Sequence, residues 1–480
     1  MNFLPQSKFL IVTLSLSLLA ASCAHEKYQA KPLDPTQASA KLLSKNVTSA
    51  DFKAYLIKQG YAEDQLPFAA WGLNELTWCA LYHHPKLEVA KAQLALASAS
   101  LKTAAQKQNP ILGGHIAHSN QANGDIRPWA YGLNVEIPIE TGNKRQIRVE
   151  EVQHLAEAAR IDVADVAWQL RSQIAKDLLR YHQNMATADA LKNELAIQTK
   201  LVDLLNKRLS LGAISSAELS AAKLRQQKAQ FTFANEQAKL AEIRSNLATD
   251  VGLPVENFNG IALKPLNLDE ALAKQSALLN IPDKSRDLQA SALLNRLDIR
   301  HSLEKYAAAE AKIKLEVAKQ TPDISLSPGF AFEFGDSIWS LGFSALLNLL
   351  NKNQTLIAEA TRLREVEGAQ FEALQARIIG DLGQSLASYQ ASLENAHGLK
   401  AQLEAQEQLT QKLQRQFDAG LIDRLDLTQN QLNTSLLEQQ LLEAQFNSLH
   451  AALLVEDVMQ RPLFDDFSML TTMSADVHHE

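Results

Sequence analysis

The stretch LNVEIPIETGNKRQIRVEEVQHLAEAARIDVADVAWQLRSQIAKDLL, residues 133–179, decides the fold. Its first part alternates apolar and polar side chains, with the apolar ones at Leu133, Val135, Ile137 and Ile139. A period of two predicts a strand with one apolar face. From Val152 onward the apolar residues are three or four apart, which predicts one buried seam of a helix. We therefore expect a short strand that leads directly into a long helix.

The same pattern occurs a second time. LGFSALLNLLNKNQ (341–354) aligns with LNVEIPIETGNKRQ (133–146) at a separation of 208 residues. The helix that follows the second copy repeats the spacing of its apolar residues, from Leu363 to Leu386. Self-similarity at a fixed separation indicates an internal duplication.

The flanking segments support this duplication. LLNRLDIRHSLEKYAAAEAKIKLEVAKQTP (293–322) aligns with LYHHPKLEVAKAQLALASASLKTAAQKQNP (81–110) at a separation of 212 residues. Downstream of the strands, Gly420 matches Gly212 at a separation of 208. The sequence therefore predicts that the whole difference of four residues lies between Pro322 and Leu341, in a shorter second hairpin.

Each repeat is predicted to contain a helix, two strands, a long helix, a glycine break and a final helix. The domains are expected at 23–75 (tether and short helical lead-in), 76–254 (repeat 1), 255–283 (irregular linker), 284–463 (repeat 2) and 464–480 (tail). The strands are expected near 111–119, 129–140, 323–334 and 338–348. The first helix should extend over about 76–108 with a bend at Pro85. The long helix over about 147–208 would measure about 90 Å.

The N-terminus has the features of a secretory signal peptide over residues 1–22. Lys8 precedes an apolar run that ends in Ala20-Ala21-Ser22-Cys23. This ending resembles a bacterial lipoprotein box, in which Cys23 becomes the first residue of the mature chain and carries lipid, palmitate included. The alternative is ordinary cleavage nearby, which leaves Cys23 as a plain thiol or removes it. Residues 24–50 are expected to form a flexible tether.

The composition excludes several classes of function. Aromatic residues make up only 6% of the chain and Gly and Pro are sparse, which is typical of long helices packed through small residues. The net charge of −7, with no basic stripe, predicts no nucleic-acid partner. Phosphate-binding loops, nucleophile elbows and zinc motifs are absent from the sequence, so we expect no enzymatic activity, no cofactor and no metal site. Beyond the N-terminus, no stretch approaches the ~20 apolar residues of a membrane helix.

The two hairpins give only four strands per chain. A strand pair with one apolar face is not stable alone in water, and sheets that cross membranes have no open edges. We therefore expect other copies of the chain to complete the sheet. Three copies would supply twelve strands.

Taken together, these elements resemble the TolC family of bacterial outer-membrane efflux ducts. The resemblance rests on the Pro-led hairpins NPILGGHIAHS and TPDISLSPGF, the aligned strand-to-helix stretches, and the glycine tips RLSLGAISSAEL and RQFDAGLIDRLDLTQ. It covers roughly residues 70–463 and both repeats. The segment NELTWCALYHHPKLEVAKAQ and the predicted lipid anchor are similar to the CusC/CzcC-like lipoprotein branch, which exports heavy metals and drugs.

This resemblance implies a mainly α protein with a small β part. Its duplicated protomer would contribute four strands to a trimeric twelve-stranded outer-membrane β-barrel, continued by a periplasmic α-helical barrel. The homotrimer would be anchored in outer-membrane lipid and would dock to a periplasmic adaptor and an inner-membrane pump of the RND or ABC type. Its function would be a passive exit duct for toxic small molecules or metal ions.

The resemblance also assigns roles to the two glycine tips. The residues expected to face the adaptor are Gly212, Ser215, Gly420 and Arg424. The residues expected to narrow the tunnel mouth are Asp423, Asp426 and Glu218, of which Asp426 matches the first family acid, whereas Gln429 replaces the second. A ring of carboxylates would attract cations and repel anions. The alternative is that these acids stabilise the helix N-termini through the helix dipole. The same residues can serve as gate and as cap.

Two other functions remain open from the sequence. The first is an outer-membrane duct of a type I polypeptide secretion system, which changes only the cargo. The second is a periplasmic helical scaffold without a pore, which explains the helices and the duplication but not the alternating strands. The sequence does not distinguish metal ions, drugs and polypeptides as cargo.

Overall fold

The computed structural model describes residues 27–463, apart from 122–123, 125–126, 280–289, 291, 334 and 348–349. The predicted signal peptide, Cys23 and the predicted tail 464–480 lie outside the described residues. The chain divides into two units, Met1–Lys45 and Asn46–Glu480, and each is described by itself.

The described part of the first unit, residues 27–45, forms one helix, α2 (Pro35–Leu43). Asp34 caps it, because a carboxylate oxygen accepts a hydrogen bond from the N–H of Thr36 at 2.8 Å, and Pro35 occupies the first helical position. The segment 24–50, which is expected to form a flexible tether, therefore includes a short helix with no buried residue.

The second unit is mainly helical with one small sheet, which confirms the predicted fold class. In chain order its elements are α3 (Ala50–Lys58), η1 (Glu63–Gln65), α4 (Leu73–His83), α5 (Pro85–Ala104), β1 (Ile111–His118), β2 (Trp129–Ile139), α6 (Lys144–Ser210), α7 (Ser216–Asp250), α8 (Val255–Asn259), α9 (Leu268–Leu278), α11 (Leu297–Ala318), β3 (Ile324–Glu333), β4 (Asp336–Ala345), α12 (Gln354–Asp418) and α13 (Arg424–Met459). Within the described residues, no helix combines the length and hydropathy needed to cross a bilayer.

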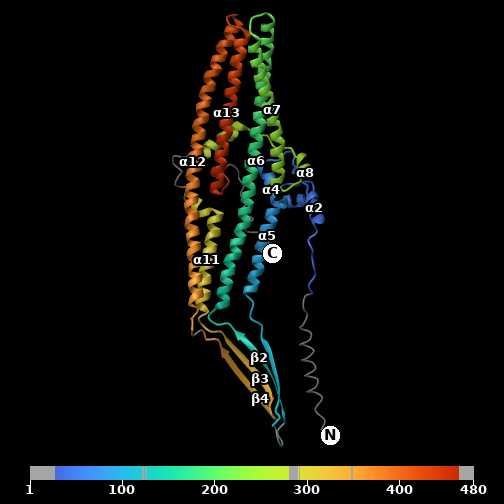
Figure 1. Cartoon of the computed structure of the whole chain (residues 1–480), viewed down its shortest axis with the longest axis vertical. Helices are drawn as coiled ribbons and strands as arrows, with labels where there is room; N and C mark the ends of the chain where they lie inside the picture. Colours follow the sequence, from blue (N-terminus) through green and yellow to red (C-terminus); the bar gives the residue numbers. More distant parts are fainter. Residues whose placement is uncertain are drawn as a thin grey trace. The chain divides into compact units, whose positions relative to one another are not determined.

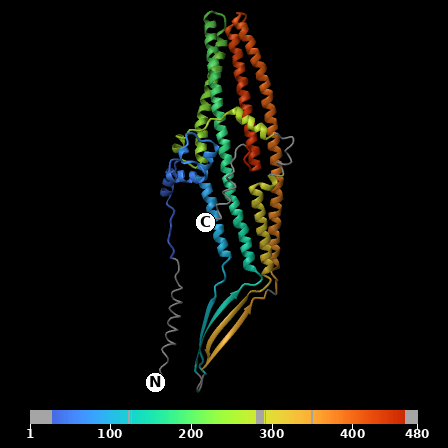
Figure 2. The same cartoon turned by 180° about the vertical axis from the view of Figure 1, so that it is seen from behind.

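The long helices form two pairs. α6 has 67 residues and α12 has 65, and each turns back through a glycine tip into α7 or α13. Figures 1 and 2 show these pairs side by side, with both tips at the end of the unit opposite the strands. The single bent helix expected over 76–108 is instead two helices, since α4 ends at His83, α5 begins at Pro85 and α5 stops at Ala104.

Contacts between helices arrange them in two open rows. Near the strands the order is α5, α6, α11, α12, and near the tips it is α7, α6, α13, α12. Each row begins with a helix of repeat 1 and ends with α12 of repeat 2. Among the helices, repeat 1 therefore contacts repeat 2 mainly through α6, while the outer sides of α5, α7 and α12 are left at the ends of the rows.

The four strands form one antiparallel sheet in the order β1-β2-β3-β4. The central contact joins the two repeats, with Leu133 opposite Phe330 and Asn134 opposite Gly329. β1 and β4 each pair on one side only within the described residues. The sheet is therefore open at both edges.

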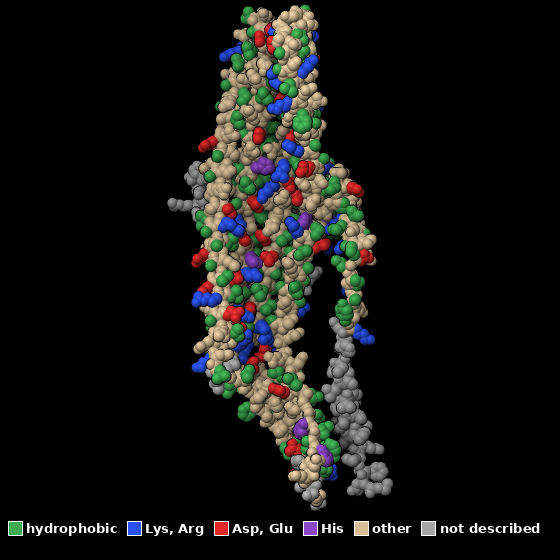
Figure 3. All heavy atoms as spheres, viewed as in Figure 1, with side chains coloured by type: hydrophobic (Ala, Val, Ile, Leu, Met, Phe, Trp, Pro, Cys, Tyr) green, Lys and Arg blue, Asp and Glu red, His purple; other side chains and the backbone are tan. Residues whose placement is uncertain are grey.

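The two faces of the sheet differ in chemistry, because paired residues share a face. The apolar face carries Leu112, Ile116, Trp129, Tyr131, Leu133, Ile137, Ile139, Leu326, Phe330, Phe332, Trp339, Leu341 and Phe343. The polar face carries mostly small or polar residues, with Ile111 and Ile338 as exceptions: Gly113, His115, Ala117, Ala130, Gly132, Asn134, Glu136, Ser325, Ser327, Gly329, Ala331, Glu333, Asp336, Ser340, Gly342 and Ser344. The strands contain no Lys or Arg, and in Figure 3 these side chains lie mainly over the helices.

The largest apolar cluster lies where α3, α4 and α8 pack against α6 and α7. Phe52, Trp78, Cys79 and Phe258 are fully or almost fully buried in it. The linker expected to be irregular is partly helical, because α8 brings Phe258 into this cluster and Asn267 caps α9 through the N–H of Glu270.

The structure corrects the alignment of the two repeats around the strands. α6 and α12 both begin after an asparagine in the left-handed conformation, Asn143 (φ 56°) and Asn353 (φ 57°). These residues are 210 positions apart, not 208, and the same separation matches Trp129 with Trp339. The prediction that all four residues are lost in the second hairpin was therefore wrong. Two are lost in the hairpin, and two more in α12, which is shorter than α6.

Candidate functional site

The two glycine tips lie close together at one end of the helix pairs. Gly212 (φ +71°) and Gly420 (φ +74°) adopt backbone conformations that side chains rarely allow, although nothing lies within 4 Å of a Cβ placed on either. Glycine is therefore required for the turn and not for space. Leu425 of the second tip packs against an apolar cluster formed by Val202, Leu205 and Leu219 of the first.

Two of the predicted gate acids, Glu218 and Asp423, cap the helices that follow the tips. The hydroxyl of Ser215 accepts a hydrogen bond from the N–H of Glu218 at 3.2 Å. In return, the Glu218 carboxylate accepts hydrogen bonds from the N–H and the hydroxyl of Ser215. In the second tip, Asp423 accepts from the N–H groups of Leu425 (2.7 Å) and Asp426 (3.1 Å). Ser215, Glu218 and Asp423 are thus capping residues, whatever further role they have.

An ion pair that the sequence analysis missed connects the two tips. Arg208, at the end of α6, pairs with Asp423, at the start of α13. The N–H of Asp426, and then Arg208 and the N–H of Leu425, hold the pKa of Asp423 below its ordinary value. Asp426 remains exposed beside this pair. Arg424, at the start of α13, lies over the ring of Phe417 of α12, 5.1 Å from its centre, so this contact stays within the second tip.

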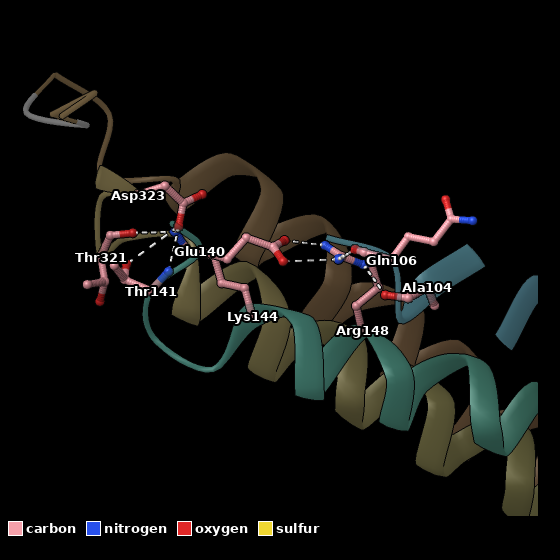
Figure 4. Close-up of polar contacts among 8 residues, drawn as sticks. All are labelled: Ala104, Gln106, Glu140, Thr141, Lys144, Arg148, Thr321 and Asp323. Carbon is pink, nitrogen blue, oxygen red and sulfur yellow. Dashed lines mark hydrogen bonds and ion pairs between the residues drawn. The ribbon is translucent and has the colours of Figure 1, made fainter. Parts of the chain in front are cut away.

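A second polar cluster lies where the strands meet the helices (Figure 4). The buried ammonium of Lys144 donates to the carbonyl of Thr321 at 2.6 Å and to the carboxylate of Asp323 at 2.7 Å. The hydroxyl of Thr141 donates to the carbonyl of Pro322 at 2.6 Å. Burial alone would raise the pKa of Asp323, but the bonds from Lys144 and Thr141 hold it below its ordinary value. This joint fixes the exit of β2 to the entrance of β3.

Arg148 extends the joint to the preceding helix. Its guanidinium donates to the carbonyl of Ala104 at 2.9 Å and to the carboxylate of Glu140 at 2.9 Å, as Figure 4 shows. The end of α5, the end of β2 and the first turns of α6 are therefore connected by one side chain. The orientation of the sheet relative to the helices is set by these contacts.

Midway along the helices, two carboxyl groups face each other. Asp177 on α6 is 2% exposed and accepts hydrogen bonds from Gln173 and Arg180, both at 2.8 Å. Asp250, the last residue of α7, has one buried carboxyl oxygen with no hydrogen-bond partner among the described residues. Burial, and then the neighbouring Asp177, raise the pKa of Asp250 to about 7, against the opposing charges of Lys86 and Arg180. The Asp250 carboxyl group is therefore partly protonated near neutral pH.

We expect Asp250→Asn to stabilise the protein at high pH. Because the pKa of Asp250 in the folded state lies above its value of 3.8 in the unfolded chain, the wild type loses stability as the pH rises towards 7. Asp250→Asn should match the wild type near pH 4 and exceed it by about 1–2 kcal/mol at pH 8, after allowance for solvent screening. Thermal unfolding across this range measures the difference. An equal gap at pH 4 and pH 8 would contradict the assignment.

In the part of the chain that the structure describes, no group of three His, Cys, Asp or Glu side chains is placed to hold a metal ion. His84 instead caps α5, with its Nδ1 accepting from the N–H of Lys86 at 3.1 Å. His115 lies 3.9 Å from Glu333 on the polar face of the sheet.

Part of the chain matches a known protein family. Residues 79–253 match the family model described as outer membrane efflux protein. The chain is 25% identical over 378 residues to the pyoverdine export outer membrane protein OpmQ of Pseudomonas aeruginosa, which covers 73% of this chain and 75% of that protein. It is 24% identical over 298 residues to the cobalt-zinc-cadmium resistance protein CzcC of Cupriavidus metallidurans, with 61% and 68% covered.

Solved structures share the fold. The outer membrane protein VceC of Vibrio cholerae superposes with a TM-score of 0.63 at 18% identity, covering 82% of this chain and 96% of that one. CusC superposes with a TM-score of 0.65 at 16% identity, covering 91% and 99%. The family match over residues 79–253 and the shared fold confirm the resemblance to the TolC family of outer-membrane efflux ducts drawn from the sequence.

Proposed function

We propose that this chain is one protomer of a passive outer-membrane exit duct in a tripartite efflux system. The observation that carries the proposal is the sheet, which has one apolar face, one face of small and polar residues, and two open edges. Trp339 and Phe343 are 81% and 82% exposed on the apolar face. Side chains of this size are rarely left in water over a continuous patch, whereas a lipid bilayer would solvate them.

The assembly that suits this sheet is a ring of three copies. Twelve strands would then surround a lumen lined by the polar face, and the helix rows would continue it as a tunnel into the periplasm. The outer sides of α5, α7 and α12, at the ends of the rows, would be covered by neighbouring copies. Transport through such a duct is passive, so the protein is not an enzyme, and energy comes from the pump.

The glycine tips are proposed to form the mouth of the tunnel. Gly212, Ser215, Gly420 and Arg424 would face a periplasmic adaptor, which connects the duct to an inner-membrane pump of the RND or ABC type. Asp423 and Asp426 would narrow the mouth, and the Arg208–Asp423 pair would hold the tips together in the closed state. The Glu218 carboxylate is held in the capping box with Ser215. It would add negative charge to the mouth from that fixed position.

The proposal also covers the transported substrate and the lipid anchor at Cys23. The export protein OpmQ and the resistance protein CzcC favour toxic small molecules or metal ions over polypeptides. Cys23 is proposed to carry lipid in the outer membrane, in addition to the anchorage that the apolar face provides. Incorporation of labelled palmitate into the wild type, but not into Cys23→Ser, tests that attachment.

The duct itself is tested by conductance in planar bilayers together with native mass. We expect a trimer with discrete, cation-preferring channels. Leu341→Lys, on the apolar face, should prevent insertion, because a lysine facing lipid costs about 2–4 kcal/mol. Its neighbour Ser340→Lys, on the polar face, should insert and conduct. A non-conducting monomer, or equal tolerance of the two lysines, would favour a scaffold without a pore.

A further inference from the structure

The internal duplication determines how one copy of the chain can join the next. Within a protomer, β2 of repeat 1 pairs with β3 of repeat 2. The edges left open are β4, the counterpart of β2, and β1, the counterpart of β3. If β4 of one copy pairs with β1 of the next in the way that β2 pairs with β3 within a copy, the register between copies follows from the alignment of the repeats.

Two separations define that alignment. KQNP (107–110) matches KQTP (319–322), which places β1 212 residues before β3. Asn143 matches Asn353 and Gly132 matches Gly342, which places β2 210 residues before β4.

The hairpin ladders test these separations independently. Ile116 pairs with Tyr131 in the first hairpin. Shifted by 212 and 210, the pair becomes Pro328 with Leu341, which is the pair found in the second hairpin. A shift of 208 for the second strand would predict Pro328 opposite Trp339, but Trp339 pairs with Phe330.

We propose that β4 of one copy pairs antiparallel with β1 of a second copy, with Ser344 of the first opposite Ala117 of the second. This is the counterpart of Asn134 opposite Gly329 within the chain. The inference rests on the proposed function, because it assumes that the sheet is completed by further copies.

The chemistry of the matched residues agrees with this register. Ser344 and Ala117 are both small and lie on the polar face, whereas Ala345 and Ile116, the next pair, lie on the apolar face. A register displaced by one residue would put apolar side chains on the polar face. Displacement by two would preserve the faces, so only the repeat alignment distinguishes those alternatives.

The polar joint beneath the sheet gives a further argument. Lys144 and Asp323 form an ion pair within the chain. At the proposed boundary between copies, Gln354 takes the place of Lys144 and Ile111 takes the place of Asp323, and both are neutral. The two charges are replaced together, so no buried charge is left without a partner at the boundary. Under the 208 alignment, Lys352 would instead be placed against Ile111.

Disulfide trapping in membranes tests the register. A Cβ placed on Gly329 lies 3.4 Å from the Cβ of Asn134, close to the 3.5–4.5 Å typical of a disulfide. We therefore expect Ser344→Cys with Ala117→Cys to give reducible covalent dimers and trimers after mild oxidation. The matched controls are Ser344→Cys with His115→Cys and Ser344→Cys with Ser119→Cys, which trap registers displaced by two residues. Asn134→Cys with Gly329→Cys should form its bond within one chain.

The outcomes separate the register from the duct. Preferential crosslinking at Ser344 and Ala117 supports the proposal. Preferential crosslinking at His115 or Ser119 overturns the register and leaves the duct intact. If the bond within one chain forms but no pair joins two copies, β4 and β1 are not neighbours in the assembly. Channel conductance of the single-cysteine variants decides separately whether the proposed duct holds.

Discussion

Replacing Glu456 with alanine should lower the free energy of unfolding by about 3–5 kcal/mol. The carboxylate of Glu456 on α13 lies 2.5 Å from the guanidinium of Arg171 on α6, and the two side chains are 4% and 1% exposed. Arg171 also lies over the ring of Trp168 at 5.3 Å, which holds it in place. Removing the carboxylate takes the Glu456 counter-charge away from a buried guanidinium, at the contact between the two repeats.

Thermal unfolding of the detergent-solubilised protein measures this effect. The matched control is Glu365→Ala, which breaks a pair of similar length, 2.6 Å to Arg362, whose side chains are 50% and 79% exposed. That change should cost less than about 1 kcal/mol. A combined Arg171→Met and Glu456→Met variant should recover most of the stability, because it removes both charges. Equal losses for Glu456→Ala and Glu365→Ala would mean that water reaches the Arg171 site.

Replacing Asp423 with asparagine should open the proposed duct. Asparagine caps a helix as well as aspartate does, so the helix start is preserved while the ion pair with Arg208 is lost. An exposed pair is worth about 0.2–1 kcal/mol. Three copies acting together would raise the open population by roughly threefold to a hundredfold.

Single-channel recording distinguishes this latch from a ring of charge. Asp426→Asn removes a neighbouring exposed carboxylate that pairs with no cation described here, so it should reduce cation preference without raising the open probability. Arg208→Gln should reproduce the effect of Asp423→Asn, because it breaks the same pair from the other tip. If the two Asp423 and Arg208 variants behave like the wild type, these residues act only as local structural contacts.

The sequence predicted the elements well where a periodic pattern was long. The alternation from Leu133 to Ile139 located β2, and the seam after Val152 located α6 to within a few residues at each end. These signals are local, because side-chain burial repeats with the period of the backbone. α2 and α9 were missed because they are short and depend on single capping residues, Asp34 and Asn267.

The register of the repeats could not be obtained from matching letters alone. Aligning Asn143 with Asn351 preserves an Asn-Lys match and gives 208, whereas the backbone equates Asn143 with Asn353. From Leu155 and Leu363 onward the apolar seam keeps a separation of 208, so the two residues by which α12 is shorter lie in the first turns of the helices, where the letters also match at 208. The Arg208–Asp423 pair was missed for a similar reason, since it joins residues 215 positions apart through the packing of the two tips.

The difference in length between α6 and α12 bears on the history of the chain. Two residues add about 3 Å along a helix and about 200° around it. When α6 and α12 are aligned at their tip ends, the residues at their other ends, near the strands, are therefore rotated relative to each other. An ancestral half-length chain, present in twice as many copies, would have had one helix length throughout. Fusion of two such genes would have allowed the halves to diverge. If the gene were now divided again, the two halves would not be interchangeable.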